Sequence, residues 1–468
     1  MFTLPFLLRR LGELGLADEP GRQALIRDGI LTLADLEQAI AERRPCAADE
    51  RLHRAAAALA TERRPISLGR AWDVLDAFIE SLSRHCPMLE AIEVSGPVRR
   101  AEPLLTGLVV VCHAADAARA GDGVAALPAA AEVLHSTLGR AVVVFDGQEI
   151  DVRVVTRDES GGVLFTTTGP PTHVADLLKR PGARLAASEI DIYASAGLAW
   201  LPPETRDSPD ALDRAARQTV PRLVQRDDIR GDLHMHTTYS DGRDPLRRMV
   251  QAARALGYEY IAITDHSENA GASRTLTLEQ IDRQAGEIAR LREETPGMAI
   301  LHGLEVDILP DGTLDCPDAV LETLDIVLAS LHESAGQSGA ALTRRCVGAI
   351  RHPLVSVITH PANQLVGRRP GYDMDYAAIY AAAAETGTAL EIDGAPSHLD
   401  LSGERAREAI EAGVTVVIDS DCHRAEWLDR QMRMGVGTAR RGWVERGHVL
   451  NTQSLDGVRA FIARKRGR

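Results

Sequence analysis

Residues 231–242 read GDLHMHTTYSDG, a stretch that places two histidines one residue apart and an aspartate five residues further on. Side chains alternate between the two faces of a β-strand, so His234 and His236 project from the same face if the stretch is extended. Asp241 follows in a loop. This spacing indicates metal ligands, but histidines that are hydrogen-bonded at a surface or in a core show the same spacing. The decision between the two depends on the rest of the chain.

From residue 230 onward, apolar runs of strand length alternate with segments of helical spacing. Seven such runs occupy residues 230–236, 258–266, 298–308, 324–332, 355–361, 388–394 and 414–423. A regular alternation of strands and helices predicts a parallel sheet, and seven units indicate a barrel related to the (β/α)₈ type. Barrels of this type form their sites at the C-terminal ends of the strands.

Six of the seven runs carry a metal-competent side chain at or near the C-terminal end. Beyond the first run, these are Asp265, His266, Glu305, His332, His360, Asp421 and His423. A cluster of imidazoles and acids at one rim is costly to bury unless cations neutralise it. Nitrogen and carboxylate ligands suit Zn²⁺, Mn²⁺ or Fe²⁺ better than Ca²⁺ or Mg²⁺.

The number of these side chains exceeds what one tetrahedral ion needs, so the sequence predicts two or three divalent ions. A carboxylate such as Glu305 can bridge them. Neighbouring ions activate water and hold the oxygens of an in-line displacement at phosphorus, which suits hydrolysis of a phosphoester. Asp265 has two interpretations: a catalytic group that handles protons, and a residue that orients its neighbours.

In their order, the strand-end motifs resemble the polymerase-and-histidinol-phosphatase (PHP) domain: GDLHMHTTYSDG, AITDHS, GLEVDIL, ASLHES, ITHPANQLVGRRPGYDMD and DSDCH. They are most similar to the version at the C-terminus of bacterial and archaeal family X DNA polymerases, as is the ending MGVGTARRGWVERGHVLNTQSL. The resemblance covers about residues 228–468. It implies a distorted (β/α)₇ barrel whose site holds three metals, and a Mn²⁺-stimulated phosphoesterase that acts as a 3′-to-5′ exonuclease. All nine family ligands have a matching residue here: His234, His236, Asp241, His266, Glu305, His332, His360, Asp421 and His423.

Two further residues of the barrel region need an interpretation. Arg369 matches a family arginine near the rim, where it is a candidate catalytic residue that holds a substrate phosphate bidentately. An ordinary loop arginine is the alternative. Cys422 lies between two candidate ligands, and because of the strand alternation it points to the opposite face. We interpret it as a core residue and not as a nucleophile.

The first 226 residues resemble family X polymerases more faintly, through IRDGILTLADLEQA, VSGPVRRAEPLLTGLVVVCHAAD and IDVRVV. The resemblance predicts an α/β chain with four parts. Residues 1–65 form a helical remnant of the helix–hairpin–helix and fingers region, and residues 66–200 an α+β, nucleotidyltransferase-like palm and thumb. Residues 201–227 are a linker, and residues 228–468 are the PHP domain.

The palm segment departs from the family at the residues that polymerisation needs. Pro97 stands where the family has serine. Residues 106–110, TGLVV, stand where the family has Gly-Asp-Ile-Asp, and no one-residue shift of the alignment restores either carboxylate. Of three carboxylates only Asp151 remains. Two-metal nucleotidyl transfer requires paired carboxylates to bridge the cations. The sequence therefore predicts that polymerase activity is lost.

Composition limits the partners and the compartment. The net charge of −14 argues against a broad basic surface for nucleic acid. Lysine occurs only at positions 179 and 465, so any phosphate contacts must come from arginine side chains. The six cysteines form no CxxC pair, which favours reduced thiols in the cytoplasm. No apolar run approaches the length of a membrane span.

Three functions are compatible with the sequence. The first is a metal-dependent phosphodiesterase that trims DNA 3′ ends, and the second is a phosphatase for a small phosphomonoester. The third is a non-enzymatic DNA-repair scaffold with a structural metal, which would require closed coordination without a water position. A steep salt dependence of DNA binding would favour the first function over the second.

Overall fold

The computed structural model describes residues 5–14, 16–48, 52, 64–130, 132–271 and 274–467. The chain divides into two compact units: one comprises Met1–Arg100 and Leu104–Thr219, the other Ala101–Pro103 and Val220–Arg468. Within the predicted helical segment 1–65, residues 49–51 and 53–63 lie outside the described residues. The predicted boundaries at residues 65, 200 and 227 stay predictions.

The first unit begins with short helices: α1 (Phe6–Glu13), α2 (Glu19–Arg27), α3 (Leu33–Ala41) and the 3₁₀ turn η1 (Pro45–Ala47). A capping box starts α3, because the Thr32 hydroxyl accepts the Asp35 N–H and the Asp35 carboxylate accepts the Thr32 N–H. The apolar faces of these helices form one core cluster with Leu134 and Val142.

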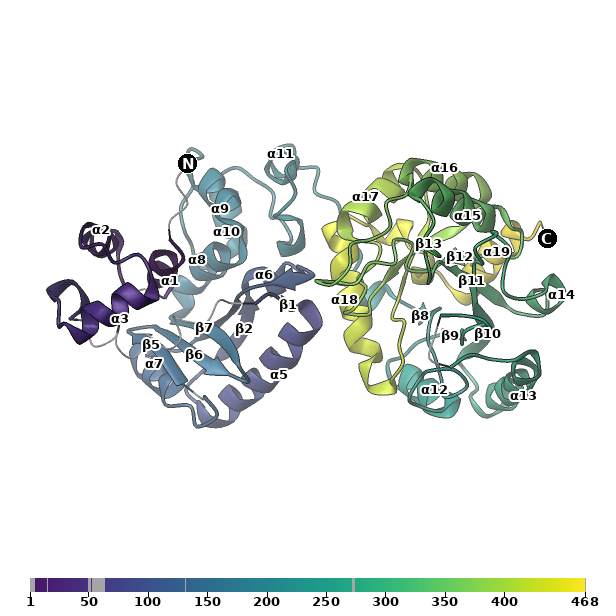
Figure 1. The fold of residues 1–468 in the computed structure, drawn as a ribbon, viewed down its shortest axis with the longest axis horizontal. Helices are drawn as coiled ribbons and strands as arrows, with labels where there is room; N and C mark the ends of the chain where they lie inside the picture. The colour runs from purple at the N-terminus through teal and green to yellow at the C-terminus, as the bar shows by residue number, and fades with distance from the viewer. Residues whose placement is uncertain are drawn as a thin grey trace. The chain divides into compact units, whose positions relative to one another are not determined.

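A five-stranded mixed sheet is the centre of the first unit, with strand order β2-β4-β7-β6-β5. Its strands are β2 (Ala91–Ser95), β4 (Leu108–His113), β5 (Glu132–Thr137), β6 (Arg140–Phe145) and β7 (Gln148–Val155). Only β4 and β7 pair in parallel. In Figure 1, α5 (Leu68–His85) runs below this sheet, and α8 (Arg157–Thr168), α9 (Pro171–Leu178) and α10 (Glu189–Ser195) lie above it.

A short β-ribbon and the remaining helices complete the first unit. A two-stranded antiparallel ribbon joins β1 (Ile66–Ser67) to β3 (Leu104–Leu105). The remaining helices are α5 (Leu68–His85), α6 (Gly96–Arg99), α7 (Ala117–Ala125), α8 (Arg157–Thr168), α9 (Pro171–Leu178), α10 (Glu189–Ser195), η2 (Pro203–Thr205) and α11 (Ala211–Ala216). On α5, Val74, Leu75, Phe78 and Leu82 are buried at helical spacing.

The second unit contains a seven-stranded sheet whose strands are adjacent in chain order and all parallel. The strands are β8 (Gly231–Asp232), β9 (Tyr260–Ile263), β10 (Ala299–Asp307), β11 (Ile326–Ser330), β12 (Val357–Ile358), β13 (Ala389–Asp393) and β14 (Val416–Asp419). A parallel bridge between Met235 and Cys422 brings the segments after β8 and β14 together, so the sheet is nearly closed. The predicted barrel of the PHP type is confirmed.

Helices surround this barrel (Figure 1): α12 (Leu246–Ala255), α13 (Leu278–Glu294), α14 (Asp318–Leu321), α15 (Gly339–Arg351), α16 (Tyr376–Thr386), α17 (Gly403–Glu411), α18 (Leu428–Arg441) and α19 (Leu455–Lys465). Four 3₁₀ turns complete the unit: η3 (Arg226–Asp228), η4 (Ala425–Trp427), η5 (Arg446–His448) and η6 (Leu450–Thr452). Among the described residues, no helix is both long enough and apolar enough to span a membrane.

Alternation along the strands separates two apolar cores and positions the candidate site. Leu301 of β10 and Leu328 of β11 belong to a cluster that includes residues of α19, whereas residues of alternate parity pack among the surrounding helices. Glu305 lies four residues after Leu301, and His332 lies four residues after Leu328. These two candidates therefore continue the inner faces of β10 and β11 toward their C-terminal ends.

Candidate metal centre

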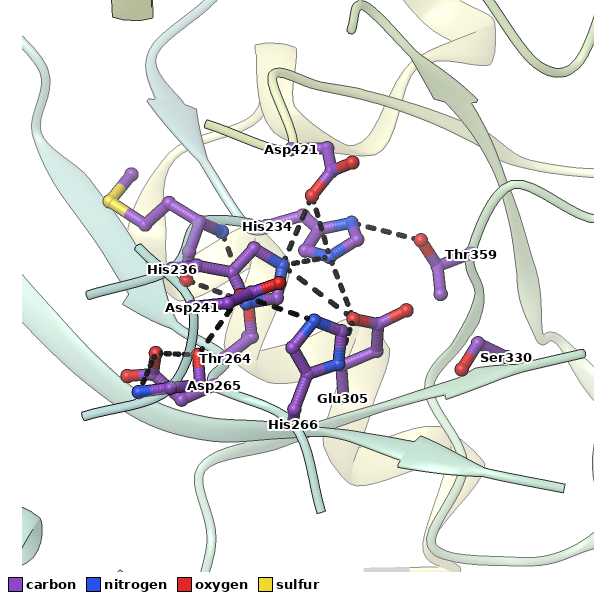
Figure 2. A network of polar contacts seen from close by, with 12 residues as sticks. His234, His236, Asp241, Thr264, Asp265, His266, Glu305, Ser330, Thr359 and Asp421 are labelled. Atoms are coloured by element: carbon purple, nitrogen blue, oxygen red, sulfur yellow. Dashed lines mark hydrogen bonds and ion pairs between the residues drawn. The ribbon is translucent and has the colours of Figure 1, made fainter. Parts of the chain in front are cut away.

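The two histidines of the GDLHMHT stretch lie where the first and last strands of the barrel meet. The N–H of His236 donates to the carbonyl oxygen of Cys422, in the segment that follows β14, at 2.9 Å. Both imidazoles are fully buried. Figure 2 shows the His234 and His236 rings directed toward Asp421 and Glu305.

A first donor group consists of His234, His236 and Asp421. The Nε2 atoms of the two histidines are 3.0 Å apart, and Asp421 Oδ1 lies 3.0 Å from His236 Nε2 and 3.5 Å from His234 Nε2. His234 Nδ1 lies 2.7 Å from Glu391 Oε1, so a neutral His234 carries its proton on Nδ1 and a lone pair on Nε2. In neutral His234 a lone pair on Nε2 therefore faces the Asp421 carboxylate oxygen, an arrangement that suits a cation.

A second group combines Asp241 with three imidazoles, those of His236, His266 and His423. Asp241 Oδ1 lies 3.2 Å from His423 Nε2 and 3.5 Å from His266 Nε2. The rings of His266 and His423 each lie 4.4 Å, centroid to centroid, from the ring of His236. The loop aspartate is therefore brought to the strand ends, as the resemblance implied for a ligand.

Glu305 connects these groups to a third one. Its Oε1 lies 3.1 Å from His332 Nε2 and 3.0 Å from His360 Nε2. Its Oε2 lies 3.1 Å from His266 Nδ1 and 3.4 Å from His234 Nε2. One carboxylate with its two oxygens directed at different imidazoles has the placement expected of a bridging ligand.

Two observations test whether these residues fit divalent cations. Glu305 Oε2 and the Nδ1 atoms of His236, His266 and His360 are buried without a hydrogen-bond partner among the described residues. Native proteins rarely leave such atoms unsatisfied. The donor set, imidazole nitrogens with carboxylate oxygens, is also the set that Zn²⁺ and similar ions prefer. The residues fit the predicted ions, and their assignment as ligands stays a proposal.

Charge and burial act in opposite directions on the pKa values of this cluster. Burial lowers the pKa of His266 to about 4. Burial also opposes protonation of His332, but the carboxylates of Glu305 and Asp307 outweigh it and raise its pKa to about 10. For Glu305 itself, burial is outweighed by the surrounding histidines, which hold its pKa well below the usual value. The Glu305 carboxylate is therefore ionised.

Two carboxylates orient the histidines from behind, and the sequence motifs do not single them out. Asp307 Oδ1 lies 2.5 Å from His332 Nδ1. Glu391 accepts a hydrogen bond from the backbone N–H of His360 at 2.6 Å and another from the Thr359 hydroxyl, in addition to its contact with the His234 ring. Such partners fix the tautomer and the orientation of a metal-binding imidazole. Asp307 lies two residues after Glu305, so strand alternation is the signal that could have found it.

Asp265 lies next to the cluster with its oxygens occupied. It accepts five hydrogen bonds, from the N–H groups and hydroxyls of Thr237 and Ser240 and from the Gln284 amide. Burial raises its pKa, partly offset by these hydrogen bonds. Of the two interpretations of Asp265, the contacts favour the orienting one, because the carboxylate holds the loop between His236 and Asp241 in place.

The two remaining candidates occupy different environments. Arg369 is exposed and donates from one guanidinium nitrogen to the carbonyl and side-chain oxygens of Asn363, both at 2.9 Å. Asn363 in turn donates to the carbonyl oxygen of His332, so Arg369 lies on a loop beside the candidate centre. Cys422 is fully buried, and burial raises the pKa of its thiol. A buried, protonated thiol is a poor nucleophile.

Comparisons with known proteins agree with this geometry. A family model described as "PHP domain" matches residues 232–388. A protein of Bacillus subtilis (strain 168) named "DNA polymerase/3'-5' exonuclease PolX" is 36% identical over 424 residues, which are 86% of this chain and 73% of that protein. A "Probable phosphatase" of Caldanaerobacter subterraneus subsp. tengcongensis is 30% identical over 254 residues, which are 51% of this chain and 92% of that protein.

Among solved structures, a histidinol phosphate phosphatase from Lactococcus lactis, in complex with zinc, L-histidinol and phosphate, is 19% identical. The match covers 46% of this chain and 95% of that one, with a TM-score of 0.34. The PHP match falls on the barrel, which identifies the chain as a metal-dependent phosphoesterase, a hydrolase of ester bonds. The resemblance to family X polymerases is confirmed, because the PolX similarity extends over both units, and the chain belongs to the family of the bacterial DNA polymerase/3'-5' exonuclease PolX.

Proposed function

We propose that the protein is a 3′-to-5′ exonuclease that processes DNA 3′ ends, and that it has lost polymerase activity. The observation that carries the first part is the convergence of three donor groups on Glu305 at the barrel mouth, in a chain similar to PolX over 86% of its length. The six cysteines form no disulfide, which supports a cytoplasmic location.

Two or three divalent ions, with Mn²⁺ as the activating ion, would be held by the nine candidate ligands and would supply Lewis-acid activation of water and of the scissile phosphate. The chain's own residues position this chemistry. Asp307 and Glu391 fix the imidazoles of His332 and His234. Hydrolysis breaks a P–O bond, adds the oxygen of water to phosphorus and returns a proton to the leaving 3′ oxygen. Arg369 is the candidate that holds a neighbouring phosphate.

The sheet of the first unit supports the loss of polymerase activity. In the parallel pair of β4 and β7, Asp151 is in register with Val109. Registered residues of parallel strands project from the same face, and Gly107 lies two residues before Val109 along that chain direction. The positions beside the remaining aspartate therefore carry a valine and a glycine. No carboxylate faces Asp151 from the neighbouring strand to share a metal ion with it.

Two arginines also form ion pairs with the Asp151 carboxylate. Arg140 and Arg153 each direct two guanidinium nitrogens at its carboxylate, at 2.9 to 3.0 Å. Against the effect of burial, these guanidinium groups hold its pKa below the usual value. A divalent ion at this carboxylate would have to displace both arginines or accept two positive neighbours.

Arg99, the last residue of α6, is also held by a carboxylate. Arg99 forms two hydrogen bonds with the Glu189 carboxylate, at 3.0 and 2.8 Å, and the fully buried Arg206 contacts the same carboxylate at 2.6 Å. An arginine held in this way is a poor ligand for an incoming triphosphate. The contacts favour a structural role for Arg99 over a role in nucleotide binding.

The test uses 5′-labelled single-stranded and primer–template DNA with Mn²⁺ and all four deoxynucleotides. We expect a ladder of shortened products and no extension. A His234→Ala, His236→Ala double variant should lose the ladder, whereas His352→Ala, which changes a histidine paired with Asp318 outside the centre, should keep it. Any extended product would contradict the loss of polymerase activity, and intact DNA would contradict the exonuclease.

A phosphatase for small phosphomonoesters is the second candidate. The relatives named as probable phosphatases and the net charge of −14 favour it. The same preparations should then hydrolyse p-nitrophenyl phosphate and leave DNA intact. DNA binding that weakens steeply with salt would favour the exonuclease, because counterion release dominates non-specific binding to DNA.

A further inference from the structure

The sixth strand of the barrel also ends in a carboxylate, Asp393, which the three donor groups around Glu305 do not use. Asp393, His398 of the following loop and Asp421 after β14 each offer one ligand atom, and these atoms all lie within 4.8 Å of one another. With Asp393 included, every strand of the barrel brings a metal-competent side chain to its C-terminal end.

One carboxylate oxygen of Asp393 is free to bind a cation. Its side chain is fully buried, and Oδ1 accepts the Ala395 N–H at 2.6 Å. Oδ2 is buried and has no hydrogen-bond partner among the described residues. Leaving a carboxylate oxygen unsatisfied in the interior, close to the carboxylates of Asp421 and Glu391, is costly. A proton or a cation must lie at this position.

His398 presents a nitrogen suited to a cation. Its Nδ1 lies 3.1 Å from the carbonyl oxygen of Gln364, which can only accept, so Nδ1 carries the proton and Nε2 keeps its lone pair. The ring stacks on His360, with the centroids 5.3 Å apart and the planes inclined by 22°. This stacking places the ring against the candidate centre, and its partial exposure leaves a route from solvent.

We propose that Asp393, His398 and Asp421 form a further divalent-cation site, the satellite site, in addition to the ions held around Glu305. Asp421 is common to both, since its Oδ1 faces His236 and His234 and a carboxylate has a second oxygen to offer. One imidazole and two carboxylates suit a borderline ion such as Zn²⁺ or Mn²⁺, and three protein ligands leave a position open. The site does not depend on whether the substrate is DNA.

A proton held between Asp393 and Asp421 is the competing arrangement, and Asp393→Asn distinguishes the two. The amide oxygen of asparagine can still accept the Ala395 N–H, and the NH₂ group can donate to Asp421 as a protonated acid would. The variant therefore preserves the hydrogen-bonded arrangement and removes the anionic ligand. His398→Gln removes the imidazole from the other side of the site.

The experiment measures bound metal in the full-length protein. Wild type, Asp393→Asn, His398→Gln and the control His352→Gln are stripped with a chelator, dialysed against Mn²⁺ or Zn²⁺, and analysed for metal per chain. We expect each site variant to bind one ion fewer than wild type and the control to bind the same number. An unchanged number in both site variants would overturn the satellite site, and so would a loss of several ions.

Anomalous diffraction from a Mn²⁺-soaked crystal of the wild type gives an independent readout. We expect a peak within bonding distance of Asp393, His398 and Asp421, separate from the peaks around Glu305. Peaks confined to the Glu305 groups would overturn the proposal. Neither measurement uses enzymatic activity, so each can fail or succeed independently of the proposed exonuclease.

Discussion

Replacing Asp151 by asparagine should destabilise the first unit, whereas in a palm with three carboxylates the same change relieves repulsion. Asp151 receives four hydrogen bonds from Arg140 and Arg153, and its side chain is 22% exposed. Breaking a buried ion pair costs about 3–5 kcal/mol, and breaking an exposed one costs less than about 1 kcal/mol. A partly buried carboxylate between two guanidinium groups lies between these limits, at about 2 kcal/mol.

Differential scanning calorimetry of the full-length protein measures this loss. For a unit of this size, about 2 kcal/mol lowers the melting temperature by roughly 4–8 °C. Adding Mn²⁺ or a chelator identifies the transition of the barrel, which should respond to metal. The matched control is Asp146→Asn, in an exposed turn, where one pair with Arg70 at 2.8 Å is lost and the expected cost is below about 1 kcal/mol.

The pH dependence has a defined sign. The pKa of Asp151 is lowered in the folded chain. Its contribution to the free energy of unfolding is therefore fully present above the pKa of the unfolded state and is lost as the pH falls through the folded pKa. The difference between wild type and Asp151→Asn should therefore disappear in acid. A melting temperature that is unchanged or raised in Asp151→Asn at neutral pH would refute the reasoning, since it would mean that the arginines do not balance this carboxylate.

Three further changes test other contacts. Glu391→Gln should weaken metal binding by about 10–100-fold in equilibrium dialysis, because His234 loses the carboxylate that fixes its tautomer; equal affinity would argue against this role. Burial lowers the pKa of His173 from 6.5 to about 4, so the unfolded state takes up the proton first and the first unit loses up to about 3 kcal/mol as the pH falls between these values. His173→Gln should flatten that loss in a calorimetric pH series, and an unchanged slope would contradict the assignment. Arg369→Ala should raise KM for DNA more than it lowers kcat, and an unchanged KM would leave only the loop contact with Asn363.

The barrel can be predicted from the sequence because its signals are local. Strand-length apolar runs alternate with helical segments, and period two within each run determines which side chains share the inner face. His234 and His236 therefore meet, and Glu305 continues the face that begins with Leu301. The order of the strands adds nothing unforeseen, since each pairs with its neighbour in the chain.

The partners of these residues depend on contacts across the fold. Glu391 contacts His234 over 157 positions of sequence, and no periodicity connects them. The arginines around Asp151 depend on the register of β6 and β7, in which Arg140 faces Arg153. A shift of that register by one residue would direct Arg140 to the other face. Sequence motifs predict that two palm carboxylates are missing, but not that arginines surround Asp151.

The two sheets of this chain neutralise buried charge in different ways. In the first unit, guanidinium groups that belong to the chain surround Asp151, so its neutralisation needs no metal ion. In the barrel, the ion pairs of Glu305 and Asp421 among the described residues are with imidazoles and not with arginines. Imidazoles change charge with pH and bind metals, so these carboxylates suit the proposed role as ligands for exchangeable cations. If polymerase activity is lost, as proposed, the arginines that surround Asp151 in place of bound ions let the first unit keep its fold, whereas the barrel keeps its acids for hydrolysis.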